Sequence, residues 1–224
     1  MLIGMRSSRS YTGVWRGFDN MTDKKTQIAN IGAAALAGIS ISIGGMALLK
    51  QGNGFGTVLF SIGLMATFFL GGRLCTGMFG YVNSGKTAVN ALIALAVNAI
   101  AAYICGVLYK SCCGEAATMA TKLAKPLYHV FLSGIVCGML IYIAVEGWRQ
   151  TGQILAIIMP VAAFVGIGAE HCIADAFFIG AGKLDGYTFV WWLCSVAGNF
   201  VGAQLAGFLK LKVQPAANND KSKG

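Results

Sequence analysis

Three ionisable side chains stand close together in one of the most hydrophobic stretches of the chain. Glu170, His171 and Asp175 lie within two helical turns of one another, inside the apolar segment 154–182. A charge at the centre of a bilayer costs about 2.5–3.5 kcal/mol on insertion scales, so such residues face a cavity or pair with a partner. Only His171 has an ordinary pKa, about 6.5, that lets its charge change near neutral pH. His171 is therefore the first candidate for proton transfer or ion binding inside a membrane.

A second hydrophobic segment, 55–79, carries a charge of the opposite sign at Arg73. The interpretation we favour is that Arg73 and Glu170 form a structural ion pair between the two segments, with Asp175 as the other possible partner. For His171 we favour a functional role over a hydrogen bond to backbone carbonyls. Thr76 follows Arg73 by three residues, and its hydroxyl is expected to face the same cavity.

The composition identifies the class of protein that must position these residues. The chain has 224 residues, 56% hydrophobic and 11% charged, with a mean hydropathy of +0.68. Soluble domains are about 25% charged, so the sequence predicts an integral membrane protein without a soluble catalytic domain. A helix needs about 20 apolar residues to cross a bilayer. Six stretches qualify, namely 28–49, 55–79, 87–109, 127–145, 154–182 and 188–209.

These spans define one membrane channel domain over 28–210, flanked by two terminal segments. In residues 1–27, aromatic residues at helical spacing around Trp15 suit a short helix on the membrane surface, and a flexible basic tail is the alternative. The start of the chain lacks the continuous apolar core of a signal peptide. Residues 211–224 are polar, and we expect them to be disordered.

The net charge of +9 reflects membrane topology rather than nucleic-acid binding. Positive residues are concentrated on the cytoplasmic side of membrane proteins. With both termini in the cytoplasm of a cell-membrane protein, that side carries Arg6, Arg9, Arg16, Lys24, Lys25, Lys86, Arg149, Lys210, Lys212, Lys221 and Lys223, and the other carries Lys50, Lys110, Lys122, Lys125 and Lys183. The seven cysteines include no C-x-x-C, which argues against a zinc site or a disulfide framework, and nothing indicates a metal or another cofactor.

The segments 55–79 and 154–182 are too long for single straight helices. The second would run about 43 Å, which exceeds the hydrocarbon core. Each has glycines just before its charged residue, Gly71 and Gly72 in one, Gly166 and Gly168 in the other. A discontinuous helix explains both features, and broken backbone inside a membrane is tolerated only where protein buries it or it lines a cavity. We therefore expect two broken helices that meet near the middle of the membrane.

The two halves of the chain resemble each other. "AVNAIAAYICG" from Ala96 superposes on "AGNFVGAQLAG" from Ala197, which pairs Asn98 with Asn199. The same comparison pairs Arg73 with Glu170, Leu74 with His171 and Cys75 with Cys172. Small residues at spacings of four also suit close helix packing in lipid, so shared composition is a competing explanation. The fold predicted is all-α, with six transmembrane helices in an inverted 3+3 repeat.

The wider sequence resembles the formate/nitrite transporter family. "FSIGLMATFFLGGRLCTGMF" from Phe60, "GIVCGMLIYIAV" from Gly134 and "IIMPVAAFVGIGAEHCIADAFF" from Ile157 follow the family pattern in order, and the Glu-His motif is specific. The resemblance covers about residues 28–210 and implies a homopentamer whose protomers each have an aquaporin-like fold and a pore of their own. It implies as substrate a small monovalent anion such as formate, nitrite, hydrosulfide, acetate or lactate. Membrane lipids and protons are the other partners expected.

The resemblance also assigns roles to residues. His171 is similar to the central pore histidine, Thr76 to the threonine opposite it, Lys122 to a lysine of the outer vestibule and Asn199 to an asparagine of the sixth span. By the same resemblance, Leu64, Leu74 and Phe164 form a cytoplasmic constriction, and Phe60, Cys75 and Ile141 form an outer one.

Two charged positions depart from the family pattern. Asp175 stands where asparagine is usual, and Arg73 stands where an acidic residue is common. The two changes together would preserve the local charge, which suggests one compensated exchange. Cys75 stands where formate-type members often have an aromatic residue, so we expect a wider outer constriction.

Two mechanisms remain open for a weak acid. In the first, Lys122 and the exposed backbone N–H groups of the interruptions attract the anion, and desolvation raises its proton affinity. His171, or water hydrogen-bonded to it, then supplies a proton, and the neutral acid crosses the apolar constriction at Leu64 and Phe164. In the second, His171 stays protonated and attracts the anion itself. Both predict strong pH dependence. An aquaporin-like channel for small neutral solutes is the alternative function, although it would not need a central Glu-His pair. An enzyme is disfavoured, because neighbouring side chains such as His171 and Cys172 diverge on a helix.

Overall fold

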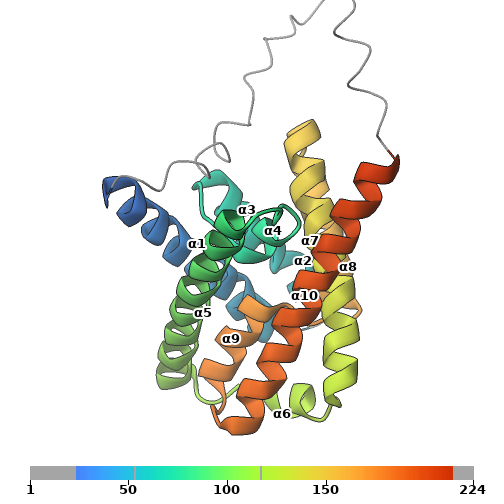
Figure 1. Cartoon of the computed structure of the whole chain (residues 1–224). Coiled ribbons are helices and arrows are strands. Elements are labelled where there is room, and N and C mark those ends of the chain that lie inside the picture. Colours follow the sequence, from blue (N-terminus) through green and yellow to red (C-terminus); the bar gives the residue numbers. More distant parts are fainter. Residues whose placement is uncertain (1–23, 53, 117, 214–224) are drawn as a thin grey trace, which may run out of the picture.

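The structure, a computed structural model, describes residues 24–52, 54–116 and 118–213, and every regular element in these ranges is a helix (Figure 1). The predicted surface helix around Trp15 lies outside the described residues, as does most of the predicted tail. The ten helices are α1 (Lys24–Gln51), α2 (Phe55–Leu59), α3 (Ser61–Phe69), α4 (Cys75–Phe79), α5 (Gly85–Cys113), α6 (Thr118–Leu123), α7 (Leu127–Thr151), α8 (Leu155–Gly166), α9 (Cys172–Ala181) and α10 (Gly186–Val213).

Four helices, α1, α5, α7 and α10, are long and apolar enough to cross a membrane. They contain four of the six predicted stretches. The other two stretches are divided among shorter helices, α2 to α4 in one case and α8 and α9 in the other. The prediction that these two segments are discontinuous is therefore confirmed.

The two interruptions are built in the same way. Gly71 and Gly168 have φ angles of +71° and +70°, which glycine adopts without the steric cost that a side chain brings. The N–H of the next residue reaches five residues back, from Gly72 to the Thr67 carbonyl (2.7 Å) and from Ala169 to the Phe164 carbonyl (2.9 Å). This is the Schellman arrangement that ends a helix. A glycine at the same place therefore ends α3 and α8.

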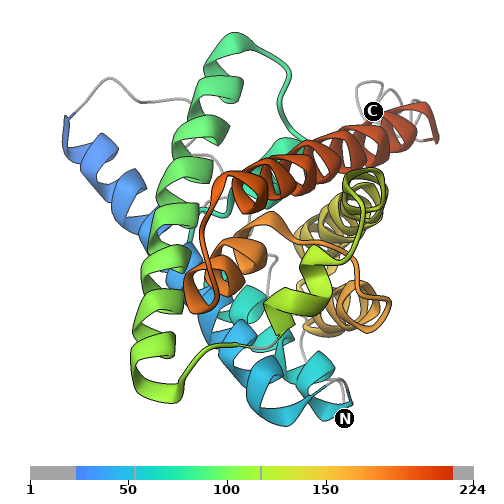
Figure 2. The same cartoon turned by 90° about the horizontal axis from the view of Figure 1, so that it is seen from below.

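Close backbone contacts hold the helices around these interruptions. A Cβ atom at Gly202 of α10 would overlap the carbonyl oxygen of Ile135 in α7, and one at Gly106 of α5 would overlap that of Phe177 in α9. Small residues at such crossings allow the dispersion contacts that drive helix association in lipid. Figures 1 and 2 show α9 lying between α5 and α10, and it packs against both.

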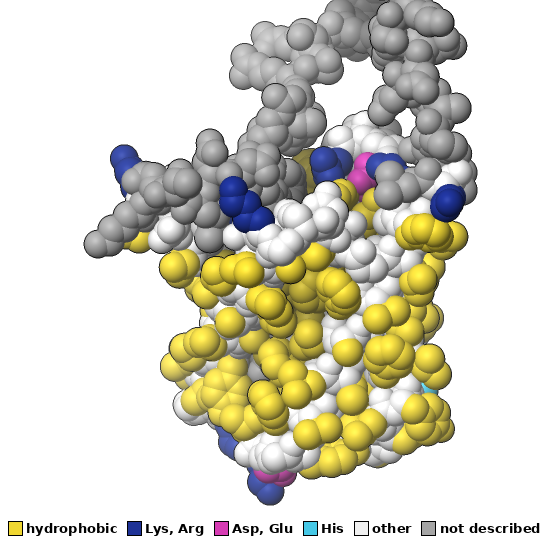
Figure 3. Space-filling model, viewed as in Figure 1, with side chains coloured by type: hydrophobic (Ala, Val, Ile, Leu, Met, Phe, Trp, Pro, Cys, Tyr) yellow, Lys and Arg dark blue, Asp and Glu magenta, His cyan; other side chains and the backbone are white. Residues whose placement is uncertain are grey.

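The molecule has two distinct ends. The start of α1 and the end of α10 lie at one end, hereafter the termini end, and α6 lies at the opposite end (Figure 1). Hydrophobic side chains cover most of the height between them on the face in Figure 3, and basic side chains gather at the termini end. This distribution suits a chain whose middle contacts lipid.

Candidate functional site

A cavity of about 210 Å³ lies between α6 and His171. Lys122, Lys125 and Asp175 are its charged lining residues, so the lining has an excess of one positive charge. Phe60, Leu48, Phe164, Val165, Ala169, Ala174 and Phe178 supply apolar surface, with Thr121 and Gly168 beside them. The cavity can therefore hold a small anion beside positive groups and apolar walls.

The backbone of α9 fixes the orientation of His171. His171 is the N-cap residue of this helix, and its Nδ1 accepts a hydrogen bond from the Ala174 N–H at 3.2 Å. A backbone N–H can only donate, so Nδ1 carries no proton, and the proton of a neutral imidazole lies on Nε2. Nε2 lies 3.2 Å from the Thr76 hydroxyl oxygen. The ring therefore presents an N–H donor toward Thr76, as the predicted opposition of these two residues requires.

Two phenylalanines pack beside the histidine ring. Phe164 stacks on His171 with ring centroids 5.6 Å apart, and Phe60 meets Phe164 edge to face at 5.8 Å. Both phenylalanines line the cavity. Phe60 and Phe164, which we expected in two different constrictions, thus contact each other beside this cavity, and the division into two constrictions stays a prediction. Leu64, Leu74, Cys75 and Ile141 are fully buried and do not line this cavity.

Both buried carboxylates are paired with lysine. Lys122 in α6 donates to Glu170 Oε2 and, at 2.8 Å, to Asp175 Oδ1. Lys125 donates to Glu170 Oε1 at 2.6 Å and to the Gly168 carbonyl at 2.9 Å. The second oxygen of Asp175 accepts from the Ser195 hydroxyl at 2.7 Å. Glu170 and Asp175 have no exposed side-chain surface, so these bonds replace their lost hydration.

Lys122, Lys125, Glu170 and Asp175 together have no net charge when all four are ionised. Burial alone would lower the pKa of Lys122, but Asp175 and Glu170 raise it above its ordinary value, so this lysine stays charged. The rings of Phe178 and Trp191 lie 5.3 and 5.6 Å from its amino group and add cation–π attraction. We expected Lys122 to attract an anion into the vestibule. In the structure it donates hydrogen bonds within a cluster that has no net charge, and its role in attracting an anion stays a prediction.

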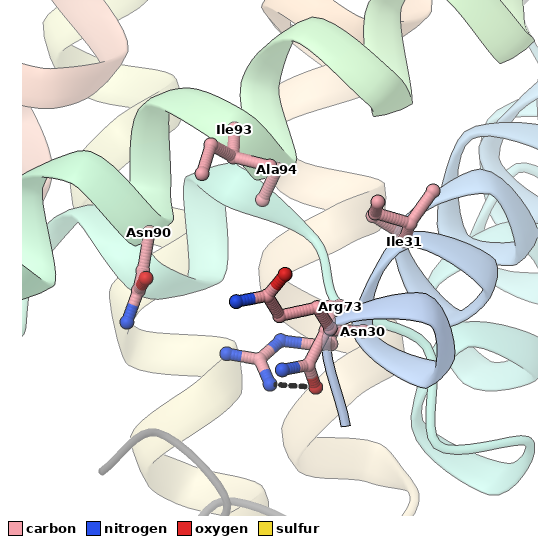
Figure 4. Close-up of a pocket in the computed structure, with 8 residues that line it drawn as sticks. Asn30, Ile31, Arg73, Asn90, Ile93 and Ala94 are labelled. Atoms are coloured by element: carbon pink, nitrogen blue, oxygen red, sulfur yellow. Dashed lines mark hydrogen bonds between the residues drawn. The ribbon is translucent and has the colours of Figure 1, made fainter. Parts of the chain in front are cut away.

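Arg73 contributes nothing to this cluster. Its Nη1 donates to Asn30 (Figure 4), which is in the second turn of α1 and so lies toward the termini end. The expected pairing of Arg73 with Glu170 is therefore wrong, and so is a compensated exchange with Asp175. Arg73 and Glu170 occupy matching places in the two interruptions, but their side chains reach different partners.

Two buried asparagines hold the interruptions in place. Asn98 of α5 accepts from the Cys75 N–H at 2.8 Å, and Asn199 of α10 accepts from the Cys172 N–H at 3.0 Å. Each amide group also donates to a carbonyl two residues before the restarted helix, Asn98 to that of Arg73 (3.0 Å) and Asn199 to that of Glu170 (2.7 Å). A third bond ties each amide to a long helix, at Ala34 in α1 and Gly134 in α7. Both expected asparagines thus satisfy backbone groups that the interruptions expose.

We expect Asn199→Leu to lower the thermal unfolding midpoint in detergent strongly. The change leaves the Cys172 N–H and the carbonyls of Glu170 and Gly134 without these partners, at about 1–3 kcal/mol for each buried group. The same substitution at Asn83, an exposed residue of a loop, is the control. Equal midpoints for the two variants would contradict a structural role for Asn199.

The sequence-based prediction missed two members of the cluster. Lys125 follows Lys122 by three residues, and the turn after α6 brings both amino groups to Glu170. Ser195 precedes Asn199 by four residues on α10, which places both on one helix face. That spacing was the available signal for Ser195. For Lys125, the short basic stretch 122–125 was the only indication.

Comparison with known proteins identifies similar sequences. The family model described as "Formate/nitrite transporter" matches residues 21–211. The chain is 28% identical over 179 residues to "Uncharacterized transporter YrhG" of Bacillus subtilis (strain 168), covering 69% of this chain and 64% of that protein. It is 32% identical over 75 residues to "Formate channel FocA" of Haemophilus influenzae, covering 32% of this chain and 26% of that protein. The matched part thus spans less than two thirds of either relative.

Two solved structures resemble the fold. A structure described as "FNT family ion channel" superposes with a TM-score of 0.79 and 18% identity, over 92% of this chain and 97% of the other. A structure described as "Pentameric formate channel with formate bound" gives a TM-score of 0.61 and 18% identity over the same shares. At this identity the likeness shows that the fold is shared.

Proposed function

The chain belongs to the formate/nitrite transporter family, and from this premise we propose that it is a membrane channel for small monovalent weak-acid anions of the formate, nitrite or hydrosulfide type. A member of a transporter family is a transport protein rather than an enzyme. One observation supports placing the anion at this site: the Nε2 donor of His171 lies beside a cavity that two lysines line. A small anion in this cavity meets charged donors and a neutral N–H donor together.

The anion enters from the α6 end and exchanges water for protein donors. Lys122 and Lys125 line the cavity, whereas Glu170, which accepts from both, does not. The lysines therefore offer short-range attraction without a large net charge. The anion then accepts a hydrogen bond from Nε2–H of His171 and from the Thr76 hydroxyl, which lie 3.2 Å apart.

Desolvation then favours the neutral acid. Removing water from an anion raises its proton affinity, as burial does for a carboxyl group. The aromatic pair Phe60 and Phe164 narrows the path, and beyond it Leu64 and Leu74 are buried among apolar residues. The free energy of losing hydration is large for an ion that crosses such a region and small for its neutral acid. The substrate therefore crosses protonated, and flux rises as the pH falls.

The proton comes from the bulk solution and reaches the anion through water at the position of His171. Because Nδ1 accepts from the Ala174 N–H, a second proton on the ring would break the cap of α9. A neutral ring that gave up its Nε2 proton would become an imidazolate. His171 therefore acts as a fixed donor that orients the anion, and bulk pH sets the supply of protons.

We propose the finer architecture on similar grounds. Six membrane segments form an inverted 3+3 repeat, which the matched glycine and asparagine contacts of the two interruptions support. Thr76, Leu64, Leu74, Phe164, Phe60, Cys75, Ile141, Lys122 and Asn199 keep their predicted pore roles. The resemblance to a structure described as pentameric supports a homopentamer. The excess of basic residues at the termini end supports a cytoplasmic location for both termini.

The alternative function is a channel for small neutral solutes with the same fold. The balanced cluster of Lys122, Lys125, Glu170 and Asp175 would then serve only to hold α6 against α9. Such a channel would pass glycerol at a rate that pH does not change.

A flux assay in proteoliposomes tests the proposal. Formate, nitrite, hydrosulfide, acetate and lactate are offered separately at mildly acidic and neutral pH, with glycerol as the neutral solute and protein-free vesicles as background. We expect rapid flux of at least one weak acid, faster at the lower pH. Flux of glycerol alone, indifferent to pH, would overturn the anion channel and favour the alternative.

A further inference from the structure

A second hollow, with a volume of about 570 Å³, lies between α7 and the turn that ends α8. Figure 2 shows these two helices side by side, and they pack against each other. We call the hollow the His129 groove. Lys125, His129 and Ser133 are its polar side chains, and Leu132, Val136, Val165 and Ile167 supply most of its apolar surface. Among the residues that line it, only Lys125 and His129 have side chains that can be charged.

The polar side of the groove lies where α7 enters the membrane. Lys125 is in the turn between α6 and α7, and the exposed His129 is in the first turn of α7. Because α7 is long and apolar enough to cross a membrane, its first turn lies near the boundary between lipid and water at the α6 end. An anion from the solution on that side can therefore reach Lys125 and His129 without entering lipid.

The groove and the cavity at His171 are neighbours. They share four lining residues, namely Lys125, Val165, Gly168 and Ala169. An ammonium group has three N–H donors. Lys125 uses two of them, for Glu170 Oε1 at 2.6 Å and for the Gly168 carbonyl at 2.9 Å, so one donor is left for a ligand. Lys125 can thus bind an anion in the groove while it stays within the cluster beside the cavity.

The charge of His129 sets the net charge at the groove. Lys125 belongs to the cluster with Lys122, Glu170 and Asp175, which has no net charge. The imidazole changes its charge between about pH 5 and 8 in histidine side chains. A protonated His129 therefore gives this part of the surface a positive charge that the cluster alone does not supply.

The helices that pack against α7 leave this charge uncompensated. Of these helices, α4 and α8 contain no charged residue, and the first charged residue of α10 is Lys210, near the termini end. Their other titratable groups are the thiols of Cys75 and Cys194 and the phenol of Tyr187. The charged residues of α7 itself, Glu146 and Arg149, lie near its other end.

We propose that the His129 groove is an outer binding site for the anion that the channel conducts. This inference rests on the proposed function. The anion accepts hydrogen bonds from the remaining N–H donor of Lys125 and from protonated His129, and Lys125 stays beside it as it moves on to the cavity at His171. Positive charge at the mouth of a path raises the local concentration of an anionic substrate. The groove therefore captures the anion best at low pH, where the neutral acid also crosses most readily.

Initial flux into proteoliposomes, measured against anion concentration, tests the site. Formate is the first probe, and every other anion of the flux assay that wild type conducts is treated in the same way. At about pH 5.5, His129→Gln should raise KM about threefold, and at about pH 7.5 it should match wild type. His129→Arg has a fixed charge, so it should match wild type at the lower pH and lower KM about threefold at the higher pH. The maximal rate should stay unchanged, because the later steps take place at His171.

Tyr128→Arg is the matched control, since it adds a charge at the neighbouring residue, which is 70% exposed and does not line the groove. We expect its KM to equal that of wild type. A KM that Tyr128→Arg lowers as much as His129→Arg does would make the effect one of surface charge and overturn the site. Anion flux with wild-type KM in both His129 variants at both pH values would overturn the site and leave the channel standing. No anion flux in wild type would overturn both. If one His129 variant does not fold, the other decides.

Discussion

Lys122→Met is expected to abolish the folded protein, and adding Asp175→Asn is expected to restore it. The single change removes the cation that bonds both Glu170 and Asp175, while Lys125 still pairs with Glu170. Asp175 is then a buried carboxylate without a cation. Breaking a buried pair in this way costs about 3–5 kcal/mol, a large part of the stability of most proteins. The double variant removes one charge of each sign and leaves Glu170 with Lys125.

Size-exclusion profiles and unfolding midpoints in detergent measure this effect. Asp175→Asn alone is the matched control and should fold, because Lys122 keeps Glu170 as a partner. If Lys122→Met folded as well as wild type, the ion pairs would be irrelevant to stability. If the double variant remained unfolded, charge balance would not be the reason for the loss.

Replacing His171 should reduce flux about 10- to 100-fold, the range expected for losing a hydrogen bond to a charged ligand. Two replacements separate its roles. His171→Asn keeps a side-chain acceptor that can cap α9, because asparagine is a preferred N-cap residue. His171→Phe keeps a ring against Phe164 but leaves the Ala174 N–H without its acceptor. We expect both to lose flux and only His171→Phe to lose thermal stability as well.

The pH dependence of the remaining flux distinguishes the source of the proton. If protons reach the substrate from water, the flux of His171→Asn stays smaller than wild type at every pH but still rises as the pH falls. A flat pH profile in this variant would instead make His171 the proton donor. If the flux of His171→Asn equalled that of wild type, the role of His171 would be limited to capping α9.

The sequence was sufficient to predict the two helix interruptions and the buried asparagines that need partners. The lengths of 55–79 and 154–182, with glycines before each charged residue, predicted two interruptions, and the structure places Gly71 and Gly168 at the matching turns. The polar amides of Asn98 and Asn199 in apolar spans predicted partners inside the protein, and both amides bond the interrupted backbone. These features are local or depend on the comparison of two halves, so a single sequence contains them.

The partners of the charged residues could not be predicted in the same way. Glu170 and Lys122 are 48 residues apart, and hydrophobic periodicity does not reveal that the short helix α6 folds back against α9. Arg73 and Glu170 have matching places in the two interruptions, and we expected them to be neighbours for that reason. Residues at matching places of the two interruptions need not be neighbours, and these two side chains contact different partners, Asn30 in α1 for Arg73 and the lysines in and after α6 for Glu170.

The order of the charged residues along the chain has a consequence for biogenesis. Lys122 and Lys125 lie on the N-terminal side of Glu170 and Asp175, so a ribosome makes the cations of the cluster first. Both lysines have therefore been made before Glu170, which precedes α9, and before Asp175, which lies in α9. The pairs can then form during insertion, and the carboxylates avoid crossing lipid alone, which costs about 2.5–3.5 kcal/mol for each charge.

Without Lys122, we expect α9 to fail to insert into the bilayer. In cells that synthesise Lys122→Met, Cys172 at the start of α9 should then react with a water-soluble thiol reagent, as mapped by mass spectrometry, whereas wild-type Cys172 is fully buried. If Cys172 did not react in newly made Lys122→Met, insertion of α9 would not depend on Lys122. We thus expect the ion cluster to be needed for insertion as well as for the stability of the folded protein.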